Sequence, residues 1–326
     1  MTATTSTVTV PQGLTLARVL VFLRDYAVLI LLGIIIIVLA IASPSFFTFA
    51  NLVNIANQNV PLALIAVAGT FVIISGAFDL STAAIYAVGS VSAAWVAVES
   101  GNVTLALIVP IAIGVVLGIV NGLAVTVLRV HSFLATLATS LIYKALAVLI
   151  TGGALIQVTA TGFSELGRGR VGGIFYSVIV LALFVAIMWF LLKGTVFGRH
   201  VFAVGGNADA ARLSGIRVDR VKVMVFALSG LAAGIAAAIG VSRIASGQPQ
   251  AGAGLELSAI AAIILGGTSI YGGVGAVWRS LAGVFLIALI GNGFDILGFN
   301  PQIKDLVTGV IILAAVALAA AGTRRR

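Results

Sequence analysis

The sequence contains no cysteine and only two histidines, His131 and His200, among its 326 residues. Without cysteine the chain cannot form disulfides, carry out thiolate chemistry or build a thiolate metal site. Two isolated histidines also exclude a histidine cluster. Charged residues make up only 8% of the chain, whereas soluble domains carry about 25%. The chain therefore has too little polar surface to cover a water-soluble globule.

The sequence is rich in apolar side chains and glycine. Hydrophobic residues make up 61% of the chain, glycine contributes 38 residues and proline only 6, and the mean hydropathy is +1.25. The apolar runs are long enough for helices that each need about 20 residues to cross a bilayer. Glycine is common where such helices pack closely together. The composition predicts an all-α polytopic membrane protein.

The apolar runs predict about ten transmembrane helices. They lie at 26–42, 59–78, 82–98, 103–128, 132–151, 174–193, 223–242, 257–271, 276–294 and 303–322. The run at 257–271 is short and ends in glycine, so we expect a broken or re-entrant helix there. Residues 1–24 have no early basic segment, and no cleavage site follows the first run, so they are not a signal peptide. We interpret 1–24 as a cytoplasmic tail, 25–322 as a membrane domain and 323–326 as a basic cytoplasmic C-terminus.

The formal net charge is +9. In a soluble protein this would suggest nucleic acid as a partner, but membrane proteins hold basic residues on the cytoplasmic side. If the N-terminus is cytoplasmic, the inside holds Arg18, Arg24, Arg129, Lys193, Arg199, Arg212, Arg217, Arg220, Lys222, Arg279, Arg324, Arg325 and Arg326. The outside holds Arg168, Arg170, Arg243 and Lys304, and Lys144 falls within a span. The asymmetry predicts two cytoplasmic termini, an even number of spans and the lipid bilayer, not nucleic acid, as the partner.

Two helices carry glycine at four-residue spacing. Gly114, Gly118 and Gly122 line one face, and Gly230 and Gly234 line another. Such faces let helix backbones approach closely in lipid. Tight helix packing is favoured over a solute path as the reason for these glycines.

A short motif recurs in the two halves of the chain. Asp79-Leu80-Ser81 returns as Glu256-Leu257-Ser258, and Asn121-Gly122 returns as Asn292-Gly293. The predicted spans place Asp79 near the inside and Glu256 near the outside. The two halves are therefore interpreted as inverted repeats, a construction common in transporters, with chance similarity as the alternative.

The sequence offers no catalytic or nucleotide-binding motif. The Gly-rich segment 266–273 lacks the Gly-Lys-Ser/Thr of a P-loop, so it is interpreted as a sharp turn between helices. Neither histidine lies in a catalytic motif, and nothing supports an enzyme. A proton-coupled transporter needs titratable groups in the membrane, and Asp79 is the one carboxylate found there beside Lys144. We weigh helix capping against a gate or pathway role for Asp79, and snorkelling or a carbonyl partner for Lys144.

Amide and hydroxyl side chains near the span ends are the groups suited to a neutral hydroxylated solute. Amides both donate and accept hydrogen bonds, which matches sugar hydroxyls. Hydrogen bonding between helices is the competing explanation and the stronger one for any single residue. The candidate pathway residues are Asn57, Gln58, Asn59, Asp79, Ser81, Asn121 and Asn292.

The polar stretch 197–222 interrupts the apolar chain. Asn207 suits an N-cap, 208–214 suits about two helical turns, and Gly215 suits a C-terminal stop. This helix is expected to present Ala208 and Ala211 to a groove on a partner, flanked by basic residues. A solvated loop with no partner is the alternative.

Several stretches match one known family in order and spacing. They lie at 57–60, 74–81, 133–137, 151–153, 203–207, 211–216, 259–262, 265–269 and 292–293. With them the chain, from about residue 45 to its C-terminus, resembles the membrane permease subunits of bacterial ABC importers for monosaccharides, the ribose/xylose/galactose type. It departs from the family pattern at Ala77-Phe78, where Gly-Ile is common, at His131-Ser132, where Pro-Pro is frequent, and at Thr82, where Gly often follows the Ser. These departures bear on the substrate more than on the mechanism.

The resemblance implies a homodimer in the bacterial inner membrane, served by a cytoplasmic ABC ATPase subunit and an extracytoplasmic sugar-binding protein. ATP and Mg would bind the ATPase, so this chain would bind no cofactor itself, which agrees with the missing P-loop. Within the loop 194–222, the residues implied in coupling to the ATPase are Gly205, Gly206, Asn207, Ala208, Ala211, Arg212 and Gly215. The alternatives are an ABC permease for an amino acid, nucleoside or autoinducer, and a secondary transporter.

Overall fold

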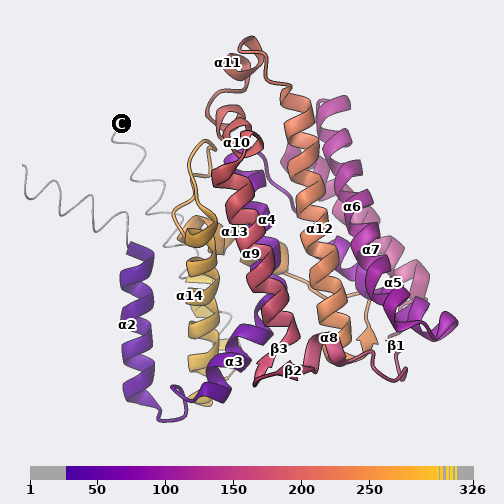
Figure 1. Ribbon diagram of the computed structural model, residues 1–326, viewed down its shortest axis with the longest axis vertical. Coiled ribbons are helices and arrows are strands. Elements are labelled where there is room, and N and C mark those ends of the chain that lie inside the picture. Colours follow the sequence, from indigo (N-terminus) through magenta and orange to yellow (C-terminus); the bar gives the residue numbers. More distant parts are fainter. Residues whose placement is uncertain (1–26, 301, 304–305, 308, 311–312, 314–326) are drawn as a thin grey trace, which may run out of the picture.

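The computed structural model describes residues 27–300, 302–303, 306–307, 309–310 and 313 of the chain. Its helices are α2 (Ala27–Ala42), α3 (Phe49–Gln58), α4 (Val60–Ile74), α5 (Thr82–Ser100), α6 (Val103–Val127), α7 (Ser132–Thr151), α8 (Glu165–Arg168), α9 (Tyr176–Gly194), α10 (Val196–Gly206), α11 (Ala208–Leu213), α12 (Val218–Ile244), α13 (Leu255–Leu265) and α14 (Val277–Ile296). The long helices run roughly along one axis (Figure 1). One end of the bundle carries α10 and α11, and the other carries α3 and α8; we call them the α11 end and the α3 end.

Short strands fasten the loops at the α3 end. β1 (Ile156–Gln157) pairs antiparallel with β4 (Ser246–Gly247), and β2 (Arg170–Val171) pairs antiparallel with β3 (Ile174–Phe175). The first pair joins the loop after α7 to the chain that leaves α12. The loop therefore lies fixed against the end of α12.

Seven helices of the described chain are long and apolar enough to cross a membrane. They are Phe49–Ile74, Thr82–Ser100, Val103–Val127, Ser132–Thr151, Tyr176–Gly194, Val218–Ile244 and Val277–Ile296, and two shorter apolar helices are Val28–Ala42 and Leu255–Leu265. Each predicted run from 26–42 to 276–294 overlaps one of these helices. The last run, 303–322, lies largely outside the described residues, and the segments 1–24 and 323–326 lie wholly outside them.

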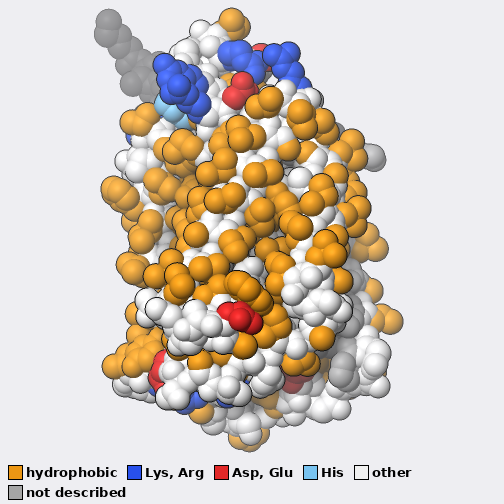
Figure 2. Space-filling model, turned by 90° about the vertical axis from the view of Figure 1, so that its right-hand side faces the viewer, with side chains coloured by type: hydrophobic (Ala, Val, Ile, Leu, Met, Phe, Trp, Pro, Cys, Tyr) orange, Lys and Arg blue, Asp and Glu red, His pale blue; other side chains and the backbone are white. Residues whose placement is uncertain are grey.

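The surface carries a broad apolar belt. Figure 2 shows hydrophobic side chains across the middle of one face of the molecule, with most of the visible Lys and Arg gathered at the α11 end. Leu141 and Leu149 of α7 and Leu183 of α9 are among the exposed apolar side chains. A belt of this kind is stable only against hydrocarbon, which supports an all-α membrane protein.

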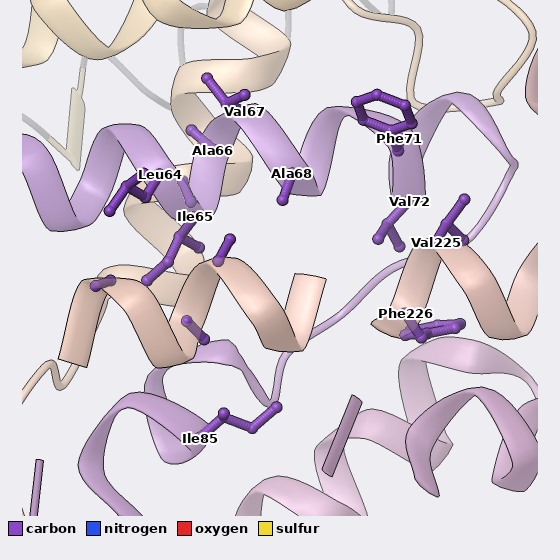
Figure 3. Close-up of a cluster of buried hydrophobic side chains, with 14 of the residues drawn as sticks. Leu64, Ile65, Ala66, Val67, Ala68, Phe71, Val72, Ile85, Val225 and Phe226 are labelled. Atoms are coloured by element: carbon purple, nitrogen blue, oxygen red, sulfur yellow. The ribbon is translucent and has the colours of Figure 1, made fainter. Parts of the chain in front are cut away.

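The centre of the bundle is formed by α4 and α12. Almost every residue of α4 is buried, as expected for a helix that is hydrophobic on all sides. Figure 3 shows Leu64, Ile65 and Phe71 of α4 in one cluster with Val225 and Phe226 of α12. The remaining helices pack around this pair.

The predicted glycine faces pack directly against each other. A Cβ built at Gly114 would lie 2.3 Å from Gly230 O, one at Gly118 would lie 2.4 Å from Phe226 O, and one at Gly234 would lie 2.4 Å from Pro110 O. These distances leave no room for any side chain. The interpretation of tight helix packing between α6 and α12 is therefore confirmed.

Replacing Gly230 by alanine is expected to lower the stability of the bundle. The new Cβ would lie 2.1 Å from Gly114 O, so the two backbones must separate, and overpacking of this kind costs about 1–3 kcal/mol. The measurement is the thermal unfolding midpoint in detergent. Gly33→Ala in α2, where a Cβ meets nothing within 4 Å, is the control and should not lower the midpoint, since alanine is the better helix former. Equal midpoints for the two variants would contradict the packing argument.

Candidate functional site

The chain is broken between α4 and α5, at residues 75–81. Hydrocarbon offers no hydrogen bonds, so a break within a membrane domain must be satisfied by protein. Phe78 N donates to Ser132 Oγ at 3.0 Å, and Leu80 N donates to Thr136 Oγ1 at 3.1 Å. Both acceptors lie on α7. The break is thus a fixed part of the fold that neighbouring side chains hold in place.

Asp79, in this break, is the centre of a chain of hydrogen bonds that we call the Asp79 network. Its Oδ1 accepts from Ser81 Oγ at 2.6 Å, and its Oδ2 accepts from Ser229 Oγ of α12 at 2.7 Å. Asn121 Nδ2 of α6 donates to Ser81 Oγ at 2.6 Å, and the Tyr143 hydroxyl of α7 donates to Asn121 Oδ1 at 3.0 Å. All five residues are buried. The network joins the break to α6, α7 and α12.

Capping does not explain Asp79 or Ser81. Ser81 occupies the N-cap position of α5, but its side chain makes no capping hydrogen bond, and Asp79 Oδ1 accepts from the backbone N of Ser81 at 2.9 Å and not from the first turn of the helix. The Ser81 hydroxyl is directed to Asp79 instead. A fully satisfied buried network of this kind fixes one arrangement of the helices it joins. Asp79, Ser81 and Asn121 therefore lie together, as members of one buried unit.

After α12 the chain turns back into the bundle before it forms α13. Gly247 lies against Ala94 of α5, and Gly252 lies against Tyr86 of the same helix. These two contacts are about 12 Å apart along α5, at 1.5 Å per residue. Only then does α13 begin, and it has 11 residues. The expectation of a broken or re-entrant helix in 257–271 is confirmed, with the helix beginning earlier and ending at Leu265.

Glu256 lies deep in the bundle, so its predicted place near the outside is wrong. Its carboxylate pairs with Lys144 Nζ at 3.7 Å, and Lys144 lies near the middle of α7. The hydropathy of 257–271 alone suggests a full span. It does not reveal that the preceding residues already enter the bundle before α13 begins. Lys144 pairs with a carboxylate and not with the carbonyl considered for it.

A small cavity lies where the two interrupted helices meet. Asp79 and Thr82 from the start of α5, Ser229 of α12 and Glu256 of α13 line it together with apolar side chains. Its volume of about 10 Å³ is close to the space that one water occupies. Thr82 Oγ1 and Glu256 Oε2 are buried and make no hydrogen bond within the described chain. The acidic residues of both copies of the repeated motif therefore face one small cavity.

A second group of the predicted pathway residues lies at the α3 end. Gln58, Asn59 and Asn292 line a pocket of about 380 Å³ between the α3–α4 junction and α14, with Arg243 and Asp295 in the same wall. Pockets of this size hold small organic ligands. Arg243 Nη1 also donates to the backbone oxygens of Asn57 and Gln58 at 3.1 Å, which fixes the junction.

The Asn57 side chain points away from this pocket. Its Nδ2 donates to Gly167 O at 3.4 Å, and its Oδ1 accepts from Ser177 Oγ. Asn292 forms a reciprocal amide pair with Asn51 at 3.1 and 3.2 Å. The structure therefore divides the seven predicted residues into the buried Asp79 network, the pocket at the α3 end and Asn57 between helices.

A third hollow opens at the α11 end. It has a volume of about 750 Å³, and its wall includes Gly76, Arg129, His131, Arg212 and Lys222. Gly76 belongs to the break between α4 and α5, so the break faces this hollow directly. The described residues contain no group of three or more His, Asp or Glu side chains placed to hold a metal ion.

The predicted capped helix in the polar loop is α11. Asn207 Oδ1 accepts from Asp209 N at 3.0 Å and from Ala210 N at 2.9 Å. The helix ends at Leu213, and Gly215 follows with φ +85°. The N-cap, the helix and the glycine stop are confirmed.

The face that α11 presents differs from the prediction. Ala211 is only 5% exposed and packs into the core, and Ala208 is partly buried, whereas Leu213 is 90% exposed. The small residues face inward because α11 lies against the rest of the loop. The expectation that Ala211 is presented to a partner is therefore wrong, and Leu213 is the exposed apolar group.

Glycines at the end of α10 form a backbone-to-backbone contact that we call the glycine junction. A Cβ at Gly205 would lie 1.6 Å from Ile74 O, and Ile74 O accepts the Gly273 N–H at 2.8 Å. Gly272 lies against Gly76. The junction of Gly76, Gly205, Gly272 and Gly273 thus joins the α10–α11 loop to the α4–α5 break and to the turn between α13 and α14.

Sequence reasoning does not single out Ser132, Thr136, Tyr143, Ser229 or Arg243. Ser132 and Thr136 lie four residues apart, so a shared helix face was a signal available in the sequence. Tyr143, Ser229 and Arg243 offer no such pattern, because their partners come from other helices.

Comparison with known proteins gives matches along most of the chain. A family model described as "Branched-chain amino acid transport system / permease component" matches residues 51–316. The chain is 43% identical over 289 residues to the ribose import permease protein RbsC of Bacillus subtilis (strain 168), covering 88% of this chain and 90% of that protein. It is 38% identical over 303 residues to RbsC of Escherichia coli (strain K12), covering 90% and 93%. It is 34% identical over 296 residues to the L-arabinose transport system permease protein AraH of the same strain, covering 90% and 89%. No solved structure matches the chain.

Proposed function

We propose that this chain, which belongs to the permease family described as "Branched-chain amino acid transport system / permease component", forms the transmembrane pathway of an ATP-driven monosaccharide importer. It is a permease component of the ABC sugar-transporter family and a multi-pass protein of the inner membrane. The observation that carries the proposal is its identity of 36–43% to ribose import permeases over about nine tenths of its length.

The energy for transport would come from a separate ATPase subunit, which would bind ATP and Mg, while this chain binds no cofactor. The receiving element in this chain is the loop 194–222 with α11, at the end of the bundle where Lys and Arg gather (Figure 2). Leu213 is the apolar group that α11 exposes, and Arg212 lies beside it in an ion pair with Asp209 at 3.2 Å. This surface would be positioned by the residues implied in coupling, which are Gly205, Gly206, Asn207, Ala208, Ala211, Arg212 and Gly215.

The solute would arrive on an extracytoplasmic binding protein that docks at the α3 end. The pocket of Gln58, Asn59 and Asn292 opens there, and amides match sugar hydroxyls because they both donate and accept. The outer loop 152–173 is the nearby surface for the binding protein. The solute would then pass the level of the Asp79 network to reach the hollow at the α11 end.

The membrane arrangement we propose has about ten spans at 25–322, an inverted repeat and a homodimer, with the tail 1–24 and the end 323–326 in the cytoplasm. Val28 packs near Ala282, and Gly293 packs against Leu39, so α2 begins towards the α11 end. The repeat is supported because Asp79 and Glu256 each lie at the start of an interrupted helix and face the same cavity.

Replacing Leu213 by aspartate is expected to weaken binding of the ATPase subunit by about tenfold or more, since a buried contact of one leucine contributes about 1.5–3 kcal/mol. The measurement is the amount of ATPase that co-purifies with the tagged permease. Leu155→Asp, in the outer loop where Leu155 is also exposed, is the matched control. If the L213D variant co-purifies as much ATPase as the wild type, α11 is not the surface that binds the ATPase.

The function itself is tested by uptake in a strain that lacks pentose importers. The chain, its ATPase and its binding protein are expressed together, and uptake of radiolabelled ribose and arabinose is measured. ATP depletion should abolish uptake while an uncoupler alone should not. The opposite pattern would indicate a secondary transporter. Uptake of leucine but of neither pentose would favour the second candidate, an amino acid permease, which the description of the family model suggests.

A further inference from the structure

The ion pair between Lys144 and Glu256 lies within the apolar belt. Lys144 is the thirteenth residue of α7, which spans Ser132–Thr151, so it lies about 18 Å along the helix from its first residue. The partner carboxylate belongs to α13, which starts only after the re-entrant segment. Lys144 is also about 10 Å along the helix from Thr151, the last residue of α7, so the ion pair lies within the length of the bundle and not at an end.

The lysine is not enclosed by the chain. Its side chain is 46% exposed, whereas that of Glu256 is 11% exposed. A charged group at this depth is costly against hydrocarbon, and intramembrane ionisable residues face the bundle interior or a water-filled cavity. Direct exposure of this edge of α7 to lipid would therefore be costly.

Buried polar atoms without hydrogen-bond partners lie next to the ion pair. Glu256 Oε2 and Thr82 Oγ1 make no hydrogen bond in the described chain, and Thr82 is 3% exposed. Both line the small cavity that also contains Asp79 and Ser229. The ammonium of Lys144 has three donors, and the carboxylate and hydroxyl oxygens accept. These are the complementary groups that a neutral solute with several hydroxyls requires.

We propose that the face of α7 and α13 carrying Lys144 and Glu256 is the wall of the aqueous solute pathway, and that Lys144, Glu256 and Thr82 contact the hydroxyls of the passing solute. The inference rests on the proposed function for the nature of the solute. The statement that water reaches Lys144 is independent of it.

The absence of cysteine from the whole chain makes a direct test possible. Lys144→Cys is introduced into the complete transporter in membrane vesicles, and labelling by the anionic reagent sulfonatoethyl methanethiosulfonate is followed with and without ATP and vanadate. The thiolate displaces methanesulfinate and a mixed disulfide forms. The control is Ile142→Cys, which is exposed on the same helix and points about 160° away at almost the same depth.

Lys144→Cys is expected to be labelled in at least one state, and at least about tenfold faster than Ile142→Cys, because a thiol in hydrocarbon does not form the reactive thiolate. The same result is expected with Glu256→Gln added, which keeps the test valid if the unpaired carboxylate impairs folding. Absence of labelling in a complex that assembles, or equal rates at the two positions, would overturn the proposal.

Uptake gives a second readout. Lys144→Cys should lower ribose uptake by at least about tenfold, as expected for loss of a charged hydrogen bond. The cationic reagent aminoethyl methanethiosulfonate restores an ammonium at this position and should restore uptake, whereas the sulfonate should not. If the wild-type complex carries no ribose, the proposed function fails while the labelling result stands. Labelling without rescue would overturn the solute contact and leave only the water-exposed wall.

Discussion

Gly205→Ala is expected to reduce ATP-dependent solute uptake to background. A Cβ at this position would lie 1.6 Å from Ile74 O and 2.8 Å from Gly273 N. These are the two atoms of a backbone hydrogen bond of 2.8 Å, so the new methyl must force them apart. The substitution therefore separates the α10–α11 loop from both interrupted helices. ATP hydrolysis by the assembled complex should continue, since α11 itself is not altered.

The neighbouring glycine supplies the control for this experiment. A Cβ at Gly206 would meet no atom within 4 Å, so Gly206→Ala should transport at close to the wild-type rate. Both residues lie in the last turn of α10, and both belong to the set implied in coupling by family resemblance. Similar uptake by the two variants would show that the glycine junction does not transmit force. Loss of membrane insertion by Gly205→Ala, seen as absence from the membrane fraction, would place the effect in folding instead.

Asp79→Ala is expected to abolish uptake and to destabilise the bundle by about 3 kcal/mol or more, because several buried donors lose their acceptor at about 1–3 kcal/mol each. The donors are Ser81 N, Ser81 Oγ and Ser229 Oγ. Asp79→Asn keeps one amide oxygen as acceptor and should retain part of the stability. The measurements are the unfolding midpoint in detergent and uptake in cells.

The control for the Asp79 substitutions is Asp209→Ala in α11. Asp209 is exposed and pairs only with Arg212 among the interactions described for it, so its loss should cost less than about 1 kcal/mol. A wild-type unfolding midpoint for Asp79→Ala would contradict the view that the Asp79 network fixes the break. A lowered midpoint with normal uptake at permissive temperature would limit the network to a structural role.

Most of the membrane fold was predictable because apolar periodicity and length determine where helices cross a bilayer. The predicted run 132–151 coincides with α7, and the run 103–128 differs from α6 by one residue. The re-entrant segment was less well predicted. The stretch 257–271 is as apolar as a span, and only the contacts of Gly247 and Gly252 with α5 reveal that the preceding chain has already entered the bundle before α13 begins.

The site was predicted as a set of residue types but not as an arrangement. Amides and hydroxyls near span ends are visible in the sequence, and Gln58, Asn59 and Asn292 do share a pocket. Which of them meet depends on helix rotation, which a single sequence does not contain. The inward turn of Ala211 has the same cause, because α11 is too short to carry a readable amphipathic pattern.

The pairing of β1 with β4 has a consequence for communication across the membrane. The outer loop donates Gly167 N to Ser242 Oγ at 3.0 Å and Arg168 Nε to Arg243 O, next to the start of the segment that leads to Glu256. A protein bound to this loop would therefore displace the segment that leads from β4 to the buried carboxylate of Glu256. Binding of a protein to the outer loop would therefore change the position of Glu256 through a segment of about ten residues, without rearrangement of the whole bundle. By thermodynamic reciprocity, a shift of α13 would change the affinity for the docked protein.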